Sequence, residues 1–195
     1  MKKLIENYFS EIKQTLDKIL LRDIEKFASA LFDVYLKGGH IFIMGNGGSA
    51  STASHFACDL SKGVLSPKNH KKIKRLKVTS LTDNMATITA WSNDLSYEKI
   101  FSEQLNNLSH EGDAVIGISA SGNSPNIIDA IKTAKKKKTI TLGLAGFNGG
   151  KLAKMADICI TAKVDKYDIA EDIHLMLAHI ITRHFFNLIN KKNYE

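Results

Sequence analysis

Proline, cysteine and tryptophan are scarce in this chain of 195 residues, which contains 2 Pro, 2 Cys and 1 Trp. No Pro-rich or Gly-rich linker divides the sequence, so we expect residues 1–195 to form a single domain around one core. The two cysteines, Cys58 and Cys159, exclude a disulfide framework, and we expect both to be reduced thiols in the core. No apolar run approaches the ~18 residues of a membrane span and no signal peptide precedes the acidic Glu6, which predicts a cytoplasmic protein without a membrane partner.

Acidic residues are also in the minority, since 27 Lys and Arg against 20 Asp and Glu give a formal net charge of +7. The basic residues gather at 68–77 and 135–138 and are otherwise spread along the chain. The sequence has neither an aromatic RNA-binding signature nor a zinc-finger spacing. We therefore interpret the charge as a solvated basic surface, with a polyanion patch as the alternative, and expect no nucleic-acid partner.

The apolar pattern predicts strands that alternate with helices. Helical spacing covers residues 3–37, with an interruption near Arg22 and Asp23, and residues 1–37 form an arm expected to pack on the sheet or in an oligomer interface. Strands are predicted at 40–44, 76–81, 114–118, 139–144 and 158–162. Helices are predicted at 49–60, 84–91, 97–108, 126–136 and 169–189, with a basic loop at 62–75 and a glycine-containing turn at 145–151. Because the strands are apolar on both faces, we expect an α/β fold, a three-layer αβα sandwich around a five-stranded parallel sheet.

Two turns of small residues each follow a predicted strand and open a predicted helix. We call residues 45–49 the glycine turn and residues 119–124 the serine turn. A turn of this kind exposes backbone N–H groups at a helix N-terminus, where an anion such as phosphate is stabilised. Ligands of parallel sheets bind beyond the carboxyl ends of the strands, where the strand order reverses. We expect both turns there, holding one phosphorylated ligand from two sides.

Each turn also has a purely structural interpretation. The glycine turn lacks the lysine of a P-loop and does not match G-x-G-x-x-G, which disfavours nucleotides, and its glycines could serve helix–sheet packing alone. In the serine turn, Ser124 precedes Pro125 and is a candidate helix N-cap. Since one serine is enough for a cap, the three hydroxyls of Ser119, Ser121 and Ser124 favour a ligand.

Histidines and carboxylates recur on two predicted helices. His55 and Asp59 are four residues apart and share a helix face, either as a local ion pair or as part of a site. The closing helix carries Glu171, His174 and His179 among apolar residues, where such side chains need partners. Glu171 and His179 are eight residues apart, about 12 Å along a straight helix, so one helix cannot easily aim both at one atom. If both serve one site, we expect a bent helix or a contribution from a neighbouring subunit.

Together these motifs resemble the sugar isomerase (SIS) domain, and more narrowly the phosphoheptose isomerases. The resemblance covers essentially the whole chain and is carried by residues 45–50, 55–57, 81–84, 93–94, 112–124, 149–151, 171–174 and His179. It implies a flavodoxin-like fold and a homotetramer whose active sites lie between subunits. The implied reaction converts sedoheptulose 7-phosphate to D-glycero-D-manno-heptose 7-phosphate, in the bacterial heptose synthesis that supplies lipopolysaccharide or capsule.

The resemblance also implies residue roles. Moving a carbonyl between C2 and C1 requires a base for the proton beside the carbonyl and an acid for the enediolate oxygen. The family uses a glutamate and a histidine, and some members hold zinc with two histidines, that glutamate and a glutamine. Here His55 and His179 match, Asp59 replaces the glutamate and Glu171 replaces the glutamine. The implied catalytic residues are Asp59, Glu171 and His179, and the implied Zn²⁺ ligands are His55, Asp59, Glu171 and His179. The implied substrate contacts are Asn46, Gly47, Gly48, Ser49, Asn93, Asp94, Ser119, Ala120, Ser121, Ser124 and Glu171.

Three questions stay open at the level of sequence. Aspartate reaches about 1.5 Å less far than glutamate, so Asp59 acts as the base only if the backbone shifts, and Glu171 is the natural substitute. A metal-free acid–base mechanism is an alternative to zinc. The chain also resembles a non-catalytic SIS protein that binds the bacterial replication initiator, although that protein lacks counterparts of His179 and Asp59. A third alternative is an isomerase that acts on another phosphosugar.

Overall fold

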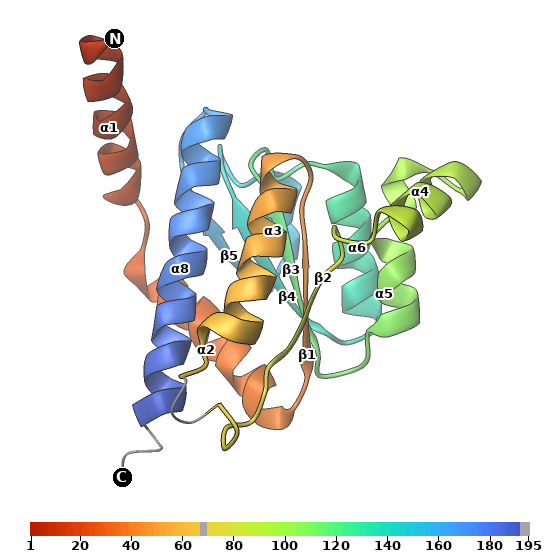
Figure 1. Ribbon diagram of the computed structural model, residues 1–195. Helices are drawn as coiled ribbons and strands as arrows, with labels where there is room; N and C mark the ends of the chain where they lie inside the picture. The colour runs from red at the N-terminus through yellow and green to blue at the C-terminus, as the bar shows by residue number, and fades with distance from the viewer. Residues whose placement is uncertain (67–69, 192–195) are drawn as a thin grey trace.

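A single parallel sheet forms the centre of the computed structural model, which describes residues 1–66 and 70–191 (Figure 1). Its strands are β1 (His40–Met44), β2 (Lys77–Ser80), β3 (Ala114–Ser119), β4 (Ile140–Ala145) and β5 (Ile158–Thr161). They pair in the order β2-β1-β3-β4-β5, and every pair is parallel. The strand order therefore reverses between β1 and β3, and ligands of such sheets bind beyond the carboxyl ends of these two strands.

Helices cover both faces of this sheet (Figure 1). They are α1 (Lys2–Leu16), α2 (Leu21–Lys37), α3 (Gly48–Cys58), α4 (Met85–Asp94), α5 (Ser102–Leu108), α6 (Pro125–Lys136), α7 (Gly150–Met155) and α8 (Tyr167–Lys191). A π-helical turn at Asp59–Gly63 extends α3, and a 3-10 turn at Tyr97–Lys99 follows α4. Helices α2, α3 and α8 pack on one face, whereas α5, α6 and α7 pack on the other. The predicted three-layer αβα fold is confirmed.

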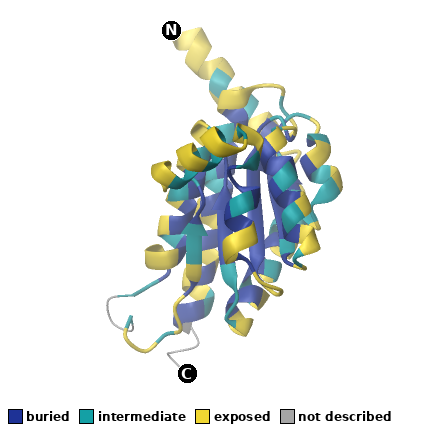
Figure 2. Cartoon of the chain, turned by 90° about the vertical axis from the view of Figure 1, so that its right-hand side faces the viewer, coloured by how far each residue is buried: buried dark blue, intermediate teal, exposed yellow. Residues whose placement is uncertain are grey.

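Successive side chains of a strand point to opposite faces of the sheet, which explains why there is one core on each face. Ile41 and Ile43 of β1 belong to the core under α2, α3 and α8, whereas Phe42 and Met44 belong to the core under α5 and α6. All six residues of β3 are buried. Figure 2 shows these strands in dark blue between helices whose outer sides are exposed. The sequences of the strands are continuously apolar because helices cover both faces of the sheet.

Several boundaries differ from the sequence prediction. The N-terminal helical segment is interrupted at residues 17–20, before Arg22 and Asp23, which lie in the first turn of α2. An acidic residue there interacts favourably with the helix dipole, so Asp23 marks a helix start. The helix predicted at 97–108 is divided at Ile100 and Phe101, which are buried between the 3-10 turn and α5. The predicted turn at 145–151 ends in the short helix α7, and residues 67–69 of the predicted basic loop lie outside the described residues.

Two expectations from composition concern membranes and thiols. In the described part of the chain, no helix combines the length and apolar character needed to cross a membrane. Cys58 and Cys159 are both free thiols, but the expectation of two core residues is wrong for Cys58, which is exposed. Its side chain falls outside the buried face of α3, which consists of Ser49, Thr52, Ala53, Phe56 and Ala57.

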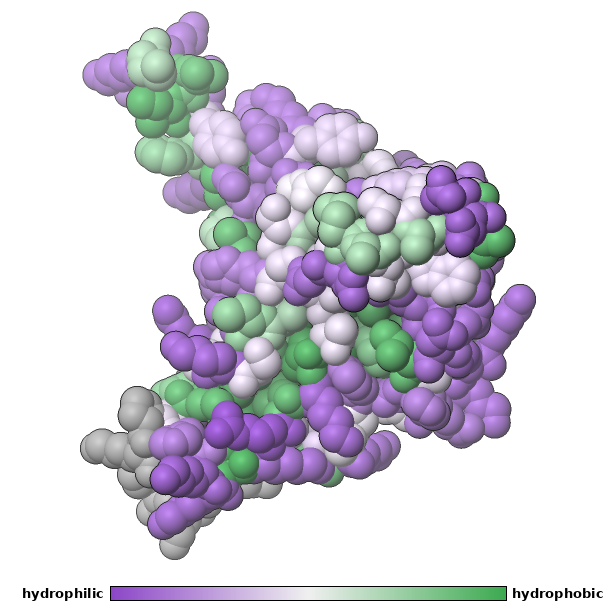
Figure 3. Space-filling model, turned by 45° about the vertical axis from the view of Figure 1, so that its right-hand side comes forward, coloured by the Kyte–Doolittle hydropathy of each residue, from purple (hydrophilic) through white to green (hydrophobic). Residues whose placement is uncertain are grey.

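Helix α1 projects from the body of the molecule (Figure 1). Only Thr15 of this helix is buried, whereas Leu4 and Phe9 are 65% and 66% exposed. Figure 3 shows apolar atoms on the surface of the projecting arm. Two polar contacts tie the arm to the start of the closing helix, since Tyr8 donates a hydrogen bond to Asp172 and Lys166 pairs with Glu11 at 2.7 Å. The arm therefore offers apolar surface that a single chain leaves uncovered.

Candidate active site

The glycine turn and the serine turn lie next to each other beyond the neighbouring strands β1 and β3. Hydrogen bonds between two side chains join the glycine turn to the first turn of α6, the helix that the serine turn opens. Asn46 Nδ2 donates to Asn126 Oδ1 at 2.9 Å, and Asn126 Nδ2 donates to Asn46 Oδ1 at 2.8 Å. The structure thus brings the two turns together at the point of strand reversal, where backbone N–H groups of α3 and α6 can face one anion.

The hydroxyls of the serine turn are arranged for more than helix capping. Ser124 occupies the N-cap of α6, but its side chain makes no capping hydrogen bond. Its Oγ lies 3.0 Å from Ser119 Oγ instead. Ser121 Oγ accepts a hydrogen bond from the backbone N–H of Asn123 at 3.2 Å and can still donate its own proton. Two hydroxyls that meet without serving the helix favour a ligand over a structural cap.

Glu171 of α8 lies against the first residue of α3. A Cβ added at Gly48 would collide with the Glu171 carboxylate. Partial burial raises the pKa of Glu171, and the neighbouring charges of Asp172 and Asp168 raise it further. A carboxylate with a raised pKa beside a glycine turn can accept hydrogen bonds from ligand hydroxyls or exchange a proton with them.

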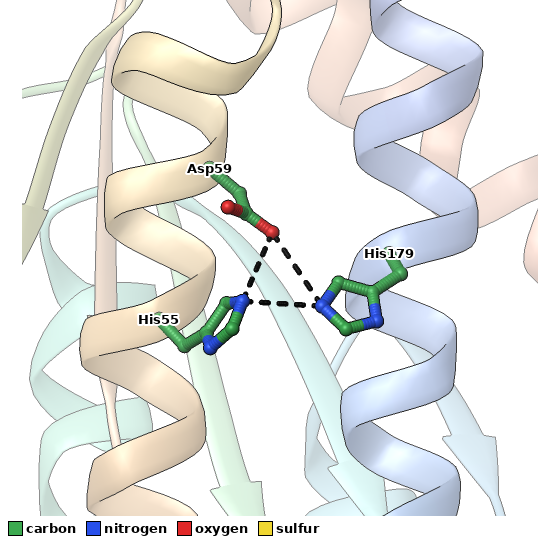
Figure 4. A group of neighbouring side chains, drawn as sticks. All are labelled: His55, Asp59 and His179. Atoms are coloured by element: carbon green, nitrogen blue, oxygen red, sulfur yellow. Dashed lines mark hydrogen bonds and ion pairs between the residues drawn. The ribbon is translucent and has the colours of Figure 1, made fainter.

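His55, Asp59 and His179 form a cluster between α3 and α8 (Figure 4). His55 Nε2 lies 3.1 Å from His179 Nε2. Asp59 Oδ2 lies 3.3 Å from His55 Nε2 and 3.7 Å from His179 Nε2. Two imidazole nitrogens at this distance require a proton or a cation between them, because their lone pairs repel. Two imidazoles and a carboxylate are also a donor set that suits zinc.

Asp59 stands at the point where the α-helix changes to a π-turn. The π-helical residues run from Asp59 to Gly63, and π-turns inside helices occur frequently at functional sites. A Cβ added at Gly63 would lie 3.5 Å from Thr182 Cγ2 of α8 and 3.7 Å from Asp59 Oδ1. The π-turn thus begins at Asp59, which keeps α-helical dihedral angles, and it places Asp59 and Gly63 close to α8.

The other residues singled out from the sequence have different surroundings. Among the described residues, the group of ligand atoms within 4.8 Å of one another contains His55, Asp59 and His179 but not Glu171. Asn93 and Asp94 are exposed at the end of α4 and are hydrogen-bonded to each other at 2.9 Å. Gly47 has a positive φ and open space around it, Ser49 is buried in the first turn of α3, and the carbonyl of Ala120 accepts a hydrogen bond from Gly146.

Sequence reasoning missed Asn126 and Tyr97. Tyr97 OH donates to Asn46 Oδ1 at 3.0 Å, and it lines a cavity of 360 Å³ beside the glycine turn. Asn126 had a detectable signal, because an amide at the start of a strongly apolar helix face needs a polar partner when it is buried. Tyr97 had none, since its contact depends on how the segment after α4 folds back over the turn.

His174 is buried in the middle of α8 and belongs to neither group. Neither ring nitrogen has a hydrogen-bond partner among the described residues. Burial lowers the pKa of His174 to about 4, and the nearby backbone of Ala145 opposes the shift. The imidazole is therefore neutral at pH 7, and among the described residues its polar surroundings come from the backbone of Ala145 instead of the hydrogen-bond partner expected from the sequence.

We expect His174 to make the protein sensitive to acid. Below pH 6.5 the unfolded chain protonates this histidine and the folded chain does not until about pH 4, so stability falls as the pH falls through that range. At pH 5 the loss is about 2 kcal/mol. In urea unfolding at pH 7.5 and pH 5, His174→Leu should lose about 2 kcal/mol less than the wild type between the two conditions. Equal losses for both proteins would contradict this origin.

Comparisons with known proteins agree with the fold. Residues 7–146 match the SIS domain family, so the class of the protein is that of the SIS-domain proteins. The phosphoheptose isomerase of Aneurinibacillus thermoaerophilus is 40% identical over 165 residues, which cover 85% of this chain and 81% of that protein. Phosphoheptose isomerase 1 of Campylobacter jejuni is 36% identical over 180 residues, which cover 91% of this chain and 94% of that protein.

Solved structures give the same result. The phosphoheptose isomerase from Neisseria gonorrhoeae matches with a TM-score of 0.85 at 29% identity, over 94% of this chain and 97% of that one. The enzyme of the same name from Francisella tularensis matches with a TM-score of 0.86 at 26% identity, over 95% and 96% of the two chains. The chain belongs to the phosphoheptose isomerase family, and the resemblance inferred from the sequence is confirmed.

Proposed function

We propose that the protein is an aldose–ketose isomerase that converts sedoheptulose 7-phosphate to D-glycero-D-manno-heptose 7-phosphate in bacterial heptose synthesis for lipopolysaccharide or capsule. The observation that carries the proposal is the pair of Asp59 and His179, a carboxylate and an imidazole 3.7 Å apart, in a member of this family. Such a pair supplies the base and the acid that a shift of a carbonyl between C2 and C1 requires.

The two turns supply the phosphate site in this proposal. Ser119, Ser121 and Ser124 donate hydroxyl protons to the phosphate, and the N-termini of α3 and α6 add backbone N–H groups. Glu171 accepts hydrogen bonds from sugar hydroxyls beside Gly48. The remaining contacts proposed for the sugar phosphate come from Asn46, Gly47, Gly48, Ser49, Asn93, Asp94 and Ala120.

Proton transfer then needs two groups of this chain. Asp59 removes a proton from C1 of the ketose while His179 protonates the C2 oxygen, which gives an enediol. Asp59 returns the proton to C2 and His179 takes one from the oxygen on C1, so the aldose forms without net loss or gain of protons. This assignment makes Asp59 the base and leaves Glu171 as a binding residue, because Asp59 lies with the acid and Glu171 does not.

We also propose that the cluster binds Zn²⁺ through His55, Asp59 and His179. Three ligand atoms within 4.8 Å of one another and the preference of zinc for imidazole and carboxylate support this assignment. When bound, the ion would polarise the carbonyl and stabilise negative charge on oxygen. Glu171 could join it only by leaving Gly48 or by coming from a neighbouring copy, since it is not a member of the cluster within one chain.

Zinc content tests this assignment directly. After dialysis against zinc and removal of excess, we expect about one Zn²⁺ per chain by mass spectrometry of the metal. His55→Ala should weaken zinc binding about 100-fold because it removes one ligand. His110→Ala, an exposed histidine that precedes β3, is the matched control and should bind zinc as the wild type does. Equal zinc affinity of all three proteins would contradict the site.

The assembly is part of the proposal as well. We propose a homotetramer with active sites between subunits, which the uncovered apolar side chains of Leu4 and Phe9 on α1 and Ile180 beside His179 support. We also propose that the chain is a single domain, because α1, α2 and α8 all contact the sheet layer or each other. We propose a location in the cytoplasm, where phosphorylated sugars are formed. Light scattering after gel filtration measures the number of copies.

Isotope exchange tests the reaction itself. Incubated with sedoheptulose 7-phosphate in D₂O, the protein should place deuterium on the carbon beside the carbonyl and produce the aldose, both detected by NMR. Exchange with another phosphosugar alone would assign the site to that substrate. A protein that exchanges no phosphosugar but captures the bacterial replication initiator would be a binding module instead of an enzyme.

The contact between Gly48 and Glu171 gives a sharper test of binding. Gly48→Ala should push the Glu171 carboxylate aside and raise KM about 10-fold, with the unfolding free energy changed by less than about 1 kcal/mol, because the new methyl meets a flexible side chain and alanine favours helix. Steady-state kinetics and urea unfolding provide the two numbers. An unchanged KM would mean that the position of Glu171 does not matter for the substrate.

A further inference from the structure

Asn126 is a buried amide in the first turn of α6, only 2% exposed, and its hydrogen bonds are all internal. Besides the reciprocal pair with Asn46, its Oδ1 accepts a hydrogen bond from the backbone N–H of Ile127 at 2.9 Å. A backbone N–H can only donate, so this bond fixes which end of the Asn126 amide is oxygen. The reciprocal pair then fixes the orientation of the Asn46 amide.

The donors and acceptors of Asn46 are largely used within the protein. Its Oδ1 accepts from both Asn126 and Tyr97, at 2.8 Å and 3.0 Å, and one of its two amide protons goes to Asn126. One side-chain proton and the backbone remain for a ligand. Most of what the Asn46 side chain does is therefore to attach the glycine turn to α6, the helix that the serine turn opens.

We propose that Asn126 is a positioning residue of the phosphate site. Its reciprocal hydrogen bonds with Asn46 set the spacing between the glycine turn and the serine turn, so that both turns can bind the same phosphate. The inference rests on the proposed function only in taking a phosphate as the group between the turns. Asn126 acts through Asn46, because a side chain buried to this degree does not reach a ligand in the crevice. A spacing fixed before binding spares the ligand the entropy of ordering two loops.

A double-mutant cycle on phosphate affinity separates this role from a direct contact. Wild type, Asn46→Ala, Asn126→Ala and the double variant are titrated with inorganic phosphate by calorimetry. Asn126→Ala should weaken binding about 10-fold, the value of one to two hydrogen bonds, and Asn46→Ala at least as much, because it also removes the free amide proton of Asn46. The double variant should lose no more than Asn46→Ala alone, because removal of either amide already breaks the pair. Asn107→Ala, an exposed asparagine of α5, is the matched control and should bind phosphate like the wild type.

Kinetics give a readout that a merely structural role would not move. Asn126→Ala should raise KM for sedoheptulose 7-phosphate by the same factor and leave kcat within about 2-fold, since it removes binding common to the ground state and the transition state. Urea unfolding confirms that each variant is folded in the assay. If Asn126→Ala does not fold, Asn126→Ser retains an acceptor near the N–H of Ile127 but is too short for Asn46, and it should show the same loss.

The outcomes distinguish this inference from the proposed reaction. Losses that multiply in the double variant, or single variants that bind phosphate as tightly as the wild type, would overturn the role of Asn126 while isomerase activity stands. A wild type that binds phosphate but does not isomerise the sugar phosphate would overturn the proposed reaction. The double-mutant cycle on phosphate affinity would then still test the role of Asn126. A wild type that binds no phosphate would overturn the inference whatever the isomerase assay shows.

Discussion

Asp59→Asn is expected to lower kcat for the isomerisation of sedoheptulose 7-phosphate about 10³-fold and to abolish the exchange of solvent deuterium into the sugar. The amide cannot take the proton from carbon, and it has the size of the carboxylate, so the packing against His55 and His179 is retained. Rates and deuterium content are measured on the same samples. Zinc content is measured in parallel, because Asp59 is also a proposed ligand.

Glu171→Gln provides the matched comparison, since it makes the same chemical change on the other helix. We expect this variant to exchange deuterium and to show mainly a raised KM, because Glu171 lies at Gly48 and outside the cluster of His55, Asp59 and His179. Exchange that survives in Asp59→Asn and disappears in Glu171→Gln would make Glu171 the base. The two carboxylates would then have the opposite roles.

Gly122→Ala is expected to cost about 3 kcal/mol or more of unfolding free energy and to abolish phosphate binding. Gly122 has φ +64, in the left-handed region, and an added Cβ would collide with the carbonyl oxygen of Gly149 and lie 3.0 Å from the nitrogen of Gly150. Its own carbonyl accepts a hydrogen bond from Leu152 at 2.9 Å. Because backbone surrounds the position, the serine turn itself must move. Urea unfolding and phosphate titration measure the two effects.

Gly112→Ala is the control for the conformational part of that cost. Gly112 has φ +89 but open space around it, so alanine there should cost only about 1 kcal/mol and leave phosphate binding unchanged. If Gly122→Ala is no more costly than Gly112→Ala, the close packing of the serine turn against the turn before α7 does not constrain the site.

The sequence is informative about features that repeat along the chain. The five strands could be predicted because they are buried on both faces, and β3 is buried at every position. The two turns could be placed together because parallel strands carry their following turns to the same edge of the sheet. His55 and Asp59 could be placed on one face because they are separated by one helical turn.

Contacts between distant elements could not be predicted from periodicity. The approach of His179 to His55 depends on how α3 and α8 pack, and the pairing of Asn46 with Asn126 depends on how α6 meets the glycine turn. The position of Glu171 against Gly48 follows from the same helix packing. The helix break near residues 17–20 was misplaced because charged residues favour a helix start as readily as an interruption. The roles of the site residues stay predictions until they are measured.

The attachment of α1 has a consequence for activity at low concentration. Tyr8 holds Asp172, the residue next to Glu171, and Glu11 holds Lys166 immediately before α8. In the proposed tetramer, contacts that immobilise the projecting arm would therefore also hold the start of α8, where Glu171 lies next to Asp172. For the proposed tetramer, mass action would make specific activity depend on dilution, because separated copies would leave the arm and the start of α8 free to move together.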